Sequence, residues 1–372
     1  MKERTIIYPY NIDFYPVLRH LNSLKSLDIA GVVSPKGWGL TGKDAGSVGG
    51  GENIGIMVES NFSNMLQSCD TVLFIESYNN LDFNSFVYPK MVEAISKGKN
   101  IISTLKIEDD IINKIEEKCE EEEVYFKSYN NLNENVKDIY IYKEEIKEIS
   151  TPIIFVLGLC DRTNKFEIQL SIREEFIRKG YKVSQVGSKN YCEMFGFHSF
   201  PNFMYSKKFT ESEKIKLFNE YIKQIEINEN PDVIVIGIPG GISPINKFVT
   251  NKFGIFAYEV SQAVTPDVSI LSLIYNSYSD KDIEFIKNSV KYKLGFEIDC
   301  LNIGNNAIDW AKLEETKLLN FITVDSNSVD KKKTLLKSRY NTIYNILNLK
   351  DAKELTEYFI NMLSASEDVQ YV

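Results

Sequence analysis

The segment from Ile153 to Leu170 carries the residues whose types and spacing best fit a binding chemistry. An apolar, β-branched run ends at Gly158, a polar loop follows, and Lys165 begins an amphipathic stretch that ends near Lys179. This order predicts a strand, a glycine turn and a helix with a lysine at its N-terminus. Backbone N–H groups and the helix dipole favour an anion at such a place. We therefore expect a phosphate-binding loop, with an ordinary strand-to-helix corner and a solvated lysine as the alternative.

The loop departs from the Walker pattern, in which a glycine, four residues and then Gly-Lys-Ser/Thr follow one another. Counted from Gly158, Lys165 comes one position late. Asn164 replaces the second glycine, and Phe166 replaces the hydroxyl that would hold magnesium. Thr163 offers a hydroxyl, but from the other side of the lysine. We therefore expect the loop to bind an anion without hydrolysing it, and we do not expect Mg²⁺.

Two further loops follow predicted strands in this half of the chain, and in a parallel sheet all three loops emerge at one edge. They cover residues 187–201 and 237–241. The expected phosphate- and ligand-binding residues of the three loops are Gly158, Asp161, Arg162, Thr163, Asn164, Lys165, Gly187, Gly237, Pro239, Gly240 and Gly241. No carboxylate stands at the end of the strand before Pro239, so Asp161 or Glu193 would have to supply any magnesium ligand.

Three side chains in these loops are candidates for catalysis. His198 has an ordinary pKa of about 6.5, which suits acid–base work; a surface or capping histidine is the alternative. Cys160 lies beside a helix terminus and Lys165, which would lower its thiol pKa and favour a nucleophile; a packed thiol is the alternative. Glu193 is the third candidate. Because the chain has only two histidines and no C-x-x-C, we expect no metal centre, with a metal or redox site of Cys160, Cys192 and His198 as the alternative.

The first half of the chain contains a glycine-rich loop between residues 37 and 55. Lys43 and Asp44 stand among its glycines, which favours a loop that faces a ligand, with a merely mobile loop as the alternative. Glu76 follows an apolar run at a predicted carboxyl end of a strand, where open α/β sheets bind their ligands. A helix cap or a surface charge would also explain it. The G-x-G-x-x-G dinucleotide fingerprint is missing from this half.

Length and composition restrict the class of protein. The 372 residues predict two domains. A net charge of −9 without a basic stripe argues against a nucleic-acid partner. The sequence offers neither a membrane span nor a signal peptide, so we expect a cytoplasmic protein with no membrane partner. Five dispersed cysteines predict reduced thiols instead of disulfides.

Alternating strands and helices predict an α/β fold of two domains, each with a mostly parallel, doubly wound sheet. We expect domains over 1–135 and 151–372 and a charged linker over 136–150. The predicted strands are 5–8, 29–33, 71–75, 100–104, 153–158, 181–186, 232–238, 258–260, 268–273, 296–303 and 321–324. The main predicted helices are 86–97, 108–123, 165–179, 211–227 and 354–363.

Most of the chain resembles a two-domain bacterial family that includes D-glutamate N-acetyltransferases. The resemblance is carried by GLTGKDAGSVGGGENIGI, TVLFIES, AISKGKNIIS and the strand, loop and helix at Gly158. It implies a Rossmann-like N-terminal domain and a degenerate P-loop NTPase-like C-terminal domain. It also implies a nucleotide (ATP or GTP) or acetyl-CoA as the ligand, and an acyltransferase-like or nucleotide-dependent activity.

Nearly the full length is similar to the clostridial peptide maturation system proteins, which are found beside radical SAM enzymes that modify small ribosomal peptides. NKFEIQL, GSKNYCEMFGFHSFP, DVIVIGIPGGISP and the Lys-, Asn- and Ile-rich composition carry this similarity. It implies an accessory role in the maturation of a ribosomally made peptide, with the precursor peptide or a radical SAM enzyme as partner. We expect a homodimer. Either the protein transfers or activates a small group on the peptide, or it is a non-catalytic scaffold or chaperone.

Overall fold

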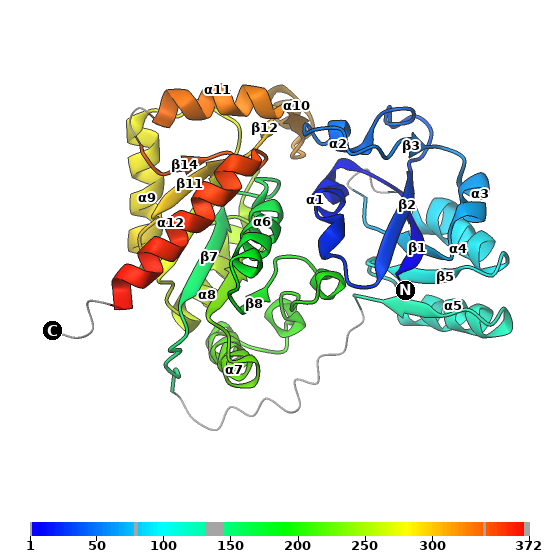
Figure 1. The fold of residues 1–372 in the computed structure, drawn as a ribbon, viewed down its shortest axis with the longest axis horizontal. Helices are drawn as coiled ribbons and strands as arrows, with labels where there is room; N and C mark the ends of the chain where they lie inside the picture. Colours follow the sequence, from blue (N-terminus) through cyan, green and yellow to red (C-terminus); the bar gives the residue numbers. More distant parts are fainter. Residues whose placement is uncertain (1, 78–80, 131–144, 338–339, 368–372) are drawn as a thin grey trace. The chain divides into compact units, whose positions relative to one another are not determined.

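The computed structural model describes residues 2–77, 81–130, 145–337 and 340–367. The chain forms two compact units, the first made of residues 1–133 and 190–196 and the second of residues 134–189 and 197–372 (Figure 1). Most of the predicted linker, 136–150, lies outside the described residues. In the parts of the chain that are described, no helix has the length and apolar character needed to cross a membrane.

The first unit is built on one parallel sheet with the strand order β3-β2-β1-β4-β5-β6. Its strands are β1 (Glu3–Tyr8), β2 (Leu27–Val33), β3 (Val58–Glu59), β4 (Thr71–Phe74), β5 (Asn100–Ser103) and β6 (Phe126–Ser128). Its α-helices are α1 (Tyr15–Arg19), α2 (Ala45–Val48), α3 (Phe62–Met65), α4 (Tyr88–Ile95) and α5 (Asp109–Glu121). This strand order is that of dinucleotide-binding folds. The prediction of a Rossmann-like first domain is therefore confirmed at the level of the fold.

The glycine-rich loop 37–55 is a folded element centred on Asp44. The Asp44 carboxylate accepts backbone N–H bonds from Gly46, Ser47, Ile54 and Gly55, the last two at 3.0 and 2.8 Å. Burial acts to raise the pKa of Asp44, but these backbone bonds outweigh it and hold the pKa below its ordinary value. A Cβ on Gly51 would lie 1.5 Å from the Tyr15 hydroxyl oxygen, so close packing explains this glycine.

The second unit is built on a parallel sheet with the strand order β14-β11-β10-β7-β9-β8. Its strands are β7 (Ile153–Gly158), β8 (Val183–Val186), β9 (Val233–Gly237), β10 (Val268–Leu273), β11 (Cys300–Ile303) and β14 (Ile343–Tyr344), and β12 (Asn306–Ile308) forms an antiparallel hairpin with β13 (Phe321–Thr323). Its α-helices are α6 (Lys165–Arg178), α7 (Glu211–Glu229), α8 (Ile255–Ala263), α9 (Asp280–Leu294), α10 (Trp310–Thr316), α11 (Ser326–Lys337) and α12 (Leu349–Glu367).

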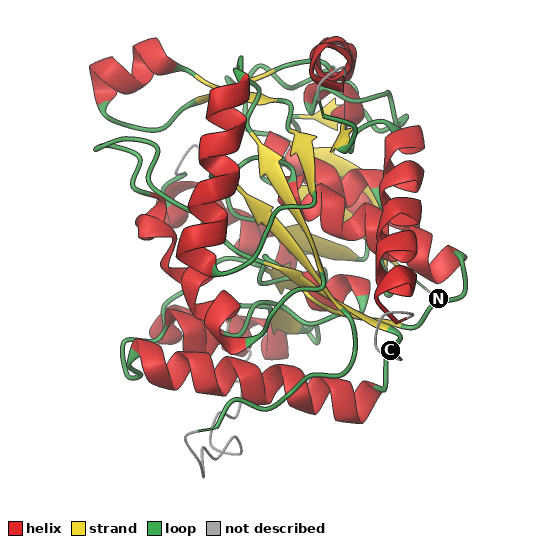
Figure 2. Cartoon of the chain, turned by 90° about the vertical axis from the view of Figure 1, so that its left-hand side faces the viewer, coloured by secondary structure: helices red, strands yellow, loops and turns green. Residues whose placement is uncertain are grey.

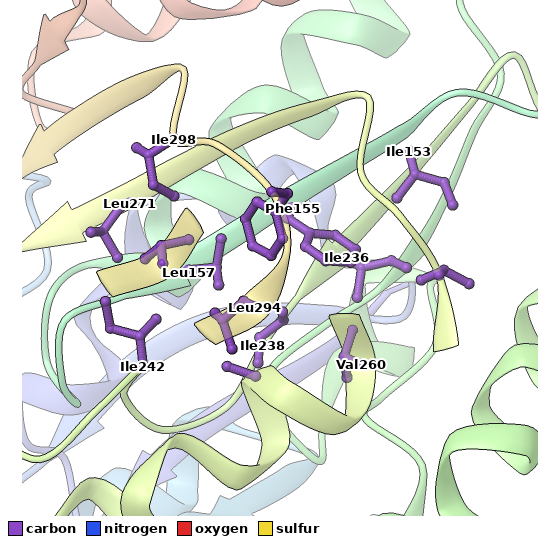
Figure 3. Close-up of a cluster of buried hydrophobic side chains, with 14 of the residues drawn as sticks. Ile153, Phe155, Leu157, Ile236, Ile238, Ile242, Val260, Leu271, Leu294 and Ile298 are labelled. Atoms are coloured by element: carbon purple, nitrogen blue, oxygen red, sulfur yellow. The ribbon is translucent and has the colours of Figure 1, made fainter. Parts of the chain in front are cut away.

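Helices cover both faces of this second sheet, as the cartoon shows (Figure 2). Side chains of β7 alternate between the two faces, as the period of a strand requires. Ile153, Phe155 and Leu157 join the cluster with α7, α8 and α9 (Figure 3). Ile154 and Val156 join the cluster with α6 and α12 on the other face. Since both faces of β7 are buried, the predicted doubly wound architecture is confirmed.

Two of the predicted strands differ from the structure, and helix α9 was not predicted. Residues 258–260, predicted as a strand, lie inside α8, because an apolar run this short has no periodicity that separates strand from helix. Residues 321–324 pair with β12 in the hairpin and do not extend the main sheet, whose edge strand is β14. Helix α9 escaped prediction although Ser279 and Asp282 form a capping box before it and Gly295 ends it in a left-handed conformation.

The described end of the predicted linker is bonded to α7. The Lys147 backbone N–H donates to Asn219 Oδ1 at 2.8 Å, and the Asn219 amide donates back to the Lys147 carbonyl at 2.9 Å. The Ser150 N–H donates to Glu226 at 2.7 Å. Residues 145–150 therefore form part of the second unit and lead directly into β7.

We predict that Asp44→Ala lowers the free energy of unfolding by about 1–2 kcal/mol, because it leaves the backbone N–H groups of the glycine loop without their acceptor. The difference from the wild type should be complete above the ordinary aspartate pKa of about 3.9. It should shrink as the pH falls through the lower folded-state pKa, since protonation removes the same acceptor. Urea unfolding at several pH values measures both effects.

Glu52→Ala is the matched control, because Glu52 is an exposed carboxylate in the same loop. It should leave the unfolding curve unchanged. Equal curves for Asp44→Ala and Glu52→Ala would show that Asp44 does not organise the loop.

Candidate phosphate-binding site

The loop between β7 and α6 turns sharply into the helix through two left-handed residues. Arg162 has φ 57° and Asn164 has φ 63° and ψ 21°. This conformation is easy for glycine and tolerated by asparagine. Asn164 therefore gives the residue before Lys165 the backbone conformation that a glycine would adopt. Lys165 is the first residue of α6, so the predicted strand, turn and helix with a lysine at its N-terminus are all present.

The Lys165 side chain is folded back over the loop and is only 7% exposed. Its Nζ donates to the Cys160 carbonyl at 3.1 Å and to the Gly240 carbonyl. The nearest carboxylate oxygen, on Asp161, is 3.9 Å away, and the Asp161 side chain is 70% exposed. Burial lowers the pKa of Lys165, and the charge of Asp161 opposes this. The loop thus encloses an ammonium group that is surrounded mainly by carbonyl oxygens.

Polar side chains from β10 and from the chain after β11 hold the loop in place. The Ser272 hydroxyl donates to the Thr163 carbonyl. The Asn164 amide donates to Asn305 Oδ1 at 3.1 Å and accepts the Asn305 N–H at 2.9 Å. The Asn306 amide donates to the Arg162 carbonyl at 3.0 Å. The sequence analysis did not identify these residues. Serine and asparagine side chains at the ends of buried strands are the pattern that could have indicated them.

The loop after β9 contacts the loop after β7. This contact was expected, because loops that follow parallel strands emerge at the same edge of a sheet. Gly240 accepts the lysine bond described above, and a Cβ on Gly241 would lie 2.6 Å from the Leu159 carbonyl oxygen. A Cβ on Gly237 would lie 2.1 Å from the amide of Gln169. Gly241 and Gly237 are therefore needed because the chain here passes close to the loop after β7 and to α6. Pro239 lies between them, and no bond of its own ties it to Lys165.

The loop after β8 reaches the site through Gln169, one turn along α6 from Lys165. The Ser188 N–H donates to Gln169 Oε1 at 3.1 Å, and Gln169 Nε2 donates to the Ser188 hydroxyl at 3.0 Å. Gln169 Nε2 also donates to the Lys165 carbonyl at 3.1 Å. Gly187 precedes this contact and bonds to the His198 carbonyl. Residues 187–188 therefore lie at the same edge of the second sheet as the loop Gly158–Lys165.

The groups that would bind magnesium in a Walker loop are occupied or missing. The Thr163 side chain is fully buried, and its hydroxyl donates to the Cys160 carbonyl at 3.2 Å. Phe166 is buried in the position of the usual hydroxyl residue. Among the described residues, no group of three or more His, Cys, Asp or Glu side chains could hold a metal ion. Asp161 is the carboxylate of the loop, and it points largely to solvent.

Cys160 does not have the lowered thiol pKa that its position predicted. Its side chain is fully buried, and burial raises the pKa to about 12, while the charge of Lys165 lowers it only in part. Its Sγ donates to the Asp161 carbonyl at 3.2 Å. The helix terminus and the lysine were read correctly from the sequence, but desolvation dominates, so the thiol is packed and not ionised.

His198 lies away from the loop between β7 and α6. Its backbone forms an isolated β-bridge with Val186 on the outer side of the edge strand β8, and β9 separates β8 from β7. At about 4.8 Å per strand, His198 stands about 14 Å across the sheet from β7. Its Nε2 contacts the Glu229 carboxylate at the end of α7. The expected catalytic role beside the phosphate loop is therefore not supported, because sequence order placed His198 in a loop without showing its lateral position.

The remaining predicted residues fall into different surroundings. The Arg162 guanidinium lies 5.3 Å from the centre of the Phe321 ring. Glu193 is exposed in the 3₁₀ helix Cys192–Phe195, which belongs to the first unit. Lys43 is exposed, and its backbone carbonyl accepts the N–H of Val58, the first residue of β3. The ligand-binding role of Lys43 and the catalytic role of Glu193 stay predictions.

In the first unit, the edge where dinucleotide folds bind their cofactor carries a segment of the chain itself. Residues 190–196 lie there: the Asn190 amide donates to the Thr104 carbonyl, just after β5, at 3.0 Å. The Tyr191 ring lies 5.3 Å from that of Phe14, which follows β1. Burial raises the pKa of Tyr191 well above its ordinary value, and the charge of Glu76 after β4 adds to this. Residues 190–196 therefore lie at the place where a ligand was expected, and a ligand-binding role of Glu76 stays a prediction.

The fold and the loop define the class: a two-unit α/β protein with a Rossmann-like first sheet and a P-loop-like second unit. No protein-family model matches the sequence, and no curated protein matches it. Among solved structures, the chain is similar to a DUF1611 family protein from Anabaena variabilis, with a TM-score of 0.63, 8% identity, and coverage of 95% of this chain and 100% of that chain. At this identity the likeness concerns the fold alone, and it confirms the two-domain α/β architecture.

Two other solved structures match more weakly. One is the nucleotide-binding protein in complex with ADP from Archaeoglobus fulgidus, with a TM-score of 0.28, 11% identity, and coverage of 55% of this chain and 88% of that chain. The other is the chimerical protein CapA2B2, with a TM-score of 0.24, 11% identity, and coverage of 42% and 76%. These TM-scores are too low for a common fold to follow from them.

We predict that Cys160 resists alkylation by iodoacetamide in the folded protein at pH 8. With a pKa of about 12, about one thiol in ten thousand is ionised at that pH, and the thiolate is the reactive form. Mass spectrometry of tryptic peptides measures the labelling. In urea all five cysteines should react, which provides the positive control. Rapid labelling of Cys160 without denaturant would contradict the packed thiol.

We also predict that Tyr191→Ala lowers the free energy of unfolding by about 3–5 kcal/mol, since it removes a buried aromatic ring from the edge of the first sheet. Urea unfolding followed by circular dichroism measures this loss. Tyr292→Ala is the control, because Tyr292 is 82% exposed, and it should have almost no effect. Similar losses in the two variants would mean that segment 190–196 is not packed in the first unit.

Proposed function

We propose that the second unit binds a phosphate group of a nucleotide or acyl-CoA at the loop Gly158–Lys165, as part of an accessory protein in the maturation of a ribosomally made peptide. The observation that carries this proposal is the Lys165 ammonium, 7% exposed, at the N-terminus of a helix of fourteen residues. Carbonyl oxygens are its close partners, and the one carboxylate nearby is 3.9 Å away and mostly exposed.

The energetics of a buried charge support an anionic ligand. Removing an ammonium group from water costs several kcal/mol unless a counter-charge compensates it. Carbonyl dipoles compensate only in part, and the Asp161 carboxylate stays in solvent. A phosphate at the helix N-terminus would supply the missing negative charge and would accept bonds from backbone N–H groups of the first turn. An anion would therefore gain more free energy of binding at this site than at an exposed lysine.

The same site favours binding or group transfer over hydrolysis. Phosphoryl transfer in P-loop enzymes uses a hydroxyl after the lysine and an acidic residue on a neighbouring strand to hold Mg²⁺. Here Phe166 follows the lysine, and β9 runs into Gly237, Ile238 and Pro239. An acyl donor, which needs its phosphates held but not cleaved, fits this set of residues. An acyltransferase-like role is therefore part of the proposal.

The biological setting of the proposal comes from the similarity of the sequence to clostridial peptide maturation system proteins. Under that hypothesis, the small group would be transferred to, or activated on, a precursor peptide, beside a radical SAM enzyme. The homodimer, the peptide partner and the cytoplasmic location stay predictions of the sequence.

The alternative is a non-catalytic scaffold or chaperone that binds the precursor peptide or a modifying enzyme. One observation favours it: the Lys165 ammonium already donates to the carbonyls of Cys160 and Gly240. If these bonds persist with every anion, the loop is only a structural corner.

We predict that ATP, GTP, acetyl-CoA or CoA raises the melting temperature of the wild-type protein and has no effect on Lys165→Met. A ligand at about 100 times its dissociation constant should stabilise the folded state by about 2.7 kcal/mol. Without ligand, Lys165→Met should be at least as stable as the wild type, because it replaces a buried charge by an apolar side chain of similar length. A thermal-shift panel measures both properties.

Lys182→Met is the control, since Lys182 is exposed at the amino end of β8, and it should keep the full ligand response. A ligand response that survives in Lys165→Met would place the binding elsewhere. If none of these ligands raises the melting temperature of the wild type, the scaffold hypothesis is favoured. The precursor peptide would then be the ligand to test.

A further inference from the structure

Helix α9 of the second unit presents two aromatic rings to solvent. Phe285 is 74% exposed and Tyr292 is 82% exposed, and they are the two most exposed aromatic side chains in the part of the chain that the structure describes. Because they are seven residues apart, they lie on one face of the helix, about 10 Å apart along its axis. Asn288 and Ser289 occupy the same face between the two rings. Large apolar groups gathered on a surface mark a contact site for another molecule.

A hollow of about 470 Å³ lies beside these rings. Its lining residues on α9 form the neighbouring row of the helix, at spacings of three and four residues, and are Glu284, Lys287, Asn288 and Lys291. Ile283 and Ile298 supply aliphatic lining. A tyrosine suits such a hollow, because its ring is apolar and its hydroxyl is polar. The same helix therefore carries projecting rings and a place that can receive one.

The charges of α9 indicate how a second copy of the chain would align with it. The first half of the helix is mainly acidic and the second half is basic. The acidic residues are Asp280, Asp282 and Glu284, the lysines of the second half are Lys287, Lys291 and Lys293, and Lys281 is the exception in the first half. This order suits the dipole of the helix itself. When two copies of α9 pack antiparallel, it also brings the acidic half of one helix against the basic half of the other. A parallel pair would bring like charges together.

A two-fold axis between Asn288 and Ser289 would give this antiparallel pair matching contacts. It places Tyr292 of the second copy level with Phe285, beside the hollow. The short side chains at the centre let the two helices approach to the usual distance of about 8–10 Å. Each copy then offers a ring and receives one, which is the self-complementary contact of a two-fold dimer.

We propose that this aromatic face of α9 is the surface by which two copies of the chain form an antiparallel dimer, with Tyr292 of each copy in the hollow of the other. The inference goes beyond the proposed function and does not depend on a ligand at Lys165. One helix face per copy buries less than the about 1,200 Å² at which stable interfaces begin, so we expect a dissociation constant in the micromolar range. Unfolding at lower protein concentration therefore reports on the monomer.

Sedimentation equilibrium of the full chain from about 1 to 100 µM spans this range and tests the dimer. We expect the wild type to change from monomer to dimer. Tyr292→Ala and Phe285→Ala should each weaken the association about 10-fold or more, the loss expected for an aromatic anchor at the centre of a contact. Phe86→Ala is the control, because Phe86 is 53% exposed in the first unit, and it should associate as the wild type does. Circular dichroism should show unchanged folding in all three variants, since the buried face of α9 stays packed.

Cross-linking tests the antiparallel direction. All five native cysteines are buried, so Ser289→Cys adds a reactive thiol at the centre of the proposed contact. A short bis-maleimide should link Ser289→Cys into a covalent dimer at protein concentrations above the dissociation constant. Lys281→Cys is the matched control near the same face of α9. It should not be linked, because antiparallel packing places its two thiols about 22 Å apart along the helices.

A wild type that stays monomeric over the whole concentration range would overturn the inference. A dimer that persists in both Tyr292→Ala and Phe285→Ala would also overturn it, because the contact would then lie elsewhere on the chain. Linkage of Lys281→Cys as readily as Ser289→Cys would contradict the antiparallel arrangement. None of these results bears on the phosphate site at Lys165, which the thermal-shift panel tests separately.

Discussion

The burial of one ammonium group, that of Lys165, is the constraint on which the second unit depends. The chain has to bring carbonyl oxygens to the ammonium from two directions, the loop after β7 and the loop after β9. Both loops must therefore approach closely, which requires a glycine at 241, and the chain turns through left-handed residues at 164 and 240. The order of the strands places β7 between β9 and β10, so these contacts follow from the topology of the sheet.

Amide side chains do much of the positioning around this group. The amides of Asn164, Asn306 and Gln169 donate within the loop or between the loop and its neighbours, and Asn305 Oδ1 accepts from Asn164 and Asn306. An amide carries both donors and an acceptor, so one side chain can satisfy backbone groups that a buried loop would otherwise leave unpaired. This network fixes the path of the loop through side-chain hydrogen bonds where the Walker pattern has its second glycine, and it is consistent with a P-loop-like turn between β7 and α6.

The two units have similar sheets but different edges. In the first unit, the strand order of a dinucleotide-binding fold is present, yet segment 190–196 with the buried Tyr191 lies where a cofactor would bind. In the second unit, the corresponding edge carries the buried ammonium of Lys165 at the start of α6. Fold alone therefore does not assign a ligand here, since the same architecture carries a buried aromatic side chain in one unit and a buried ammonium group in the other.

The sequence by itself determined the elements whose signals are local. Buried β-branched runs predicted most of the central strands, and the glycine turn before Lys165 predicted the start of α6, because strand and helix periods are short-range properties. Residues 258–260 show the limit, since three apolar residues carry no usable period. The strand, the glycine turn and the helix that begins at Lys165 could all be predicted in this way.

Only the tertiary structure decided which of these residues meet and what surrounds them. It separated His198 from the loop by two strands, because lateral strand order is not encoded in sequence distance. It reversed the expected pKa shift of Cys160, because desolvation depends on the packing of distant residues. It brought Ser272, Asn305 and the chain before Lys189 to the loop from separate parts of the sequence. Burial and lateral position arise from long-range packing, and these two properties determine the chemistry of the site.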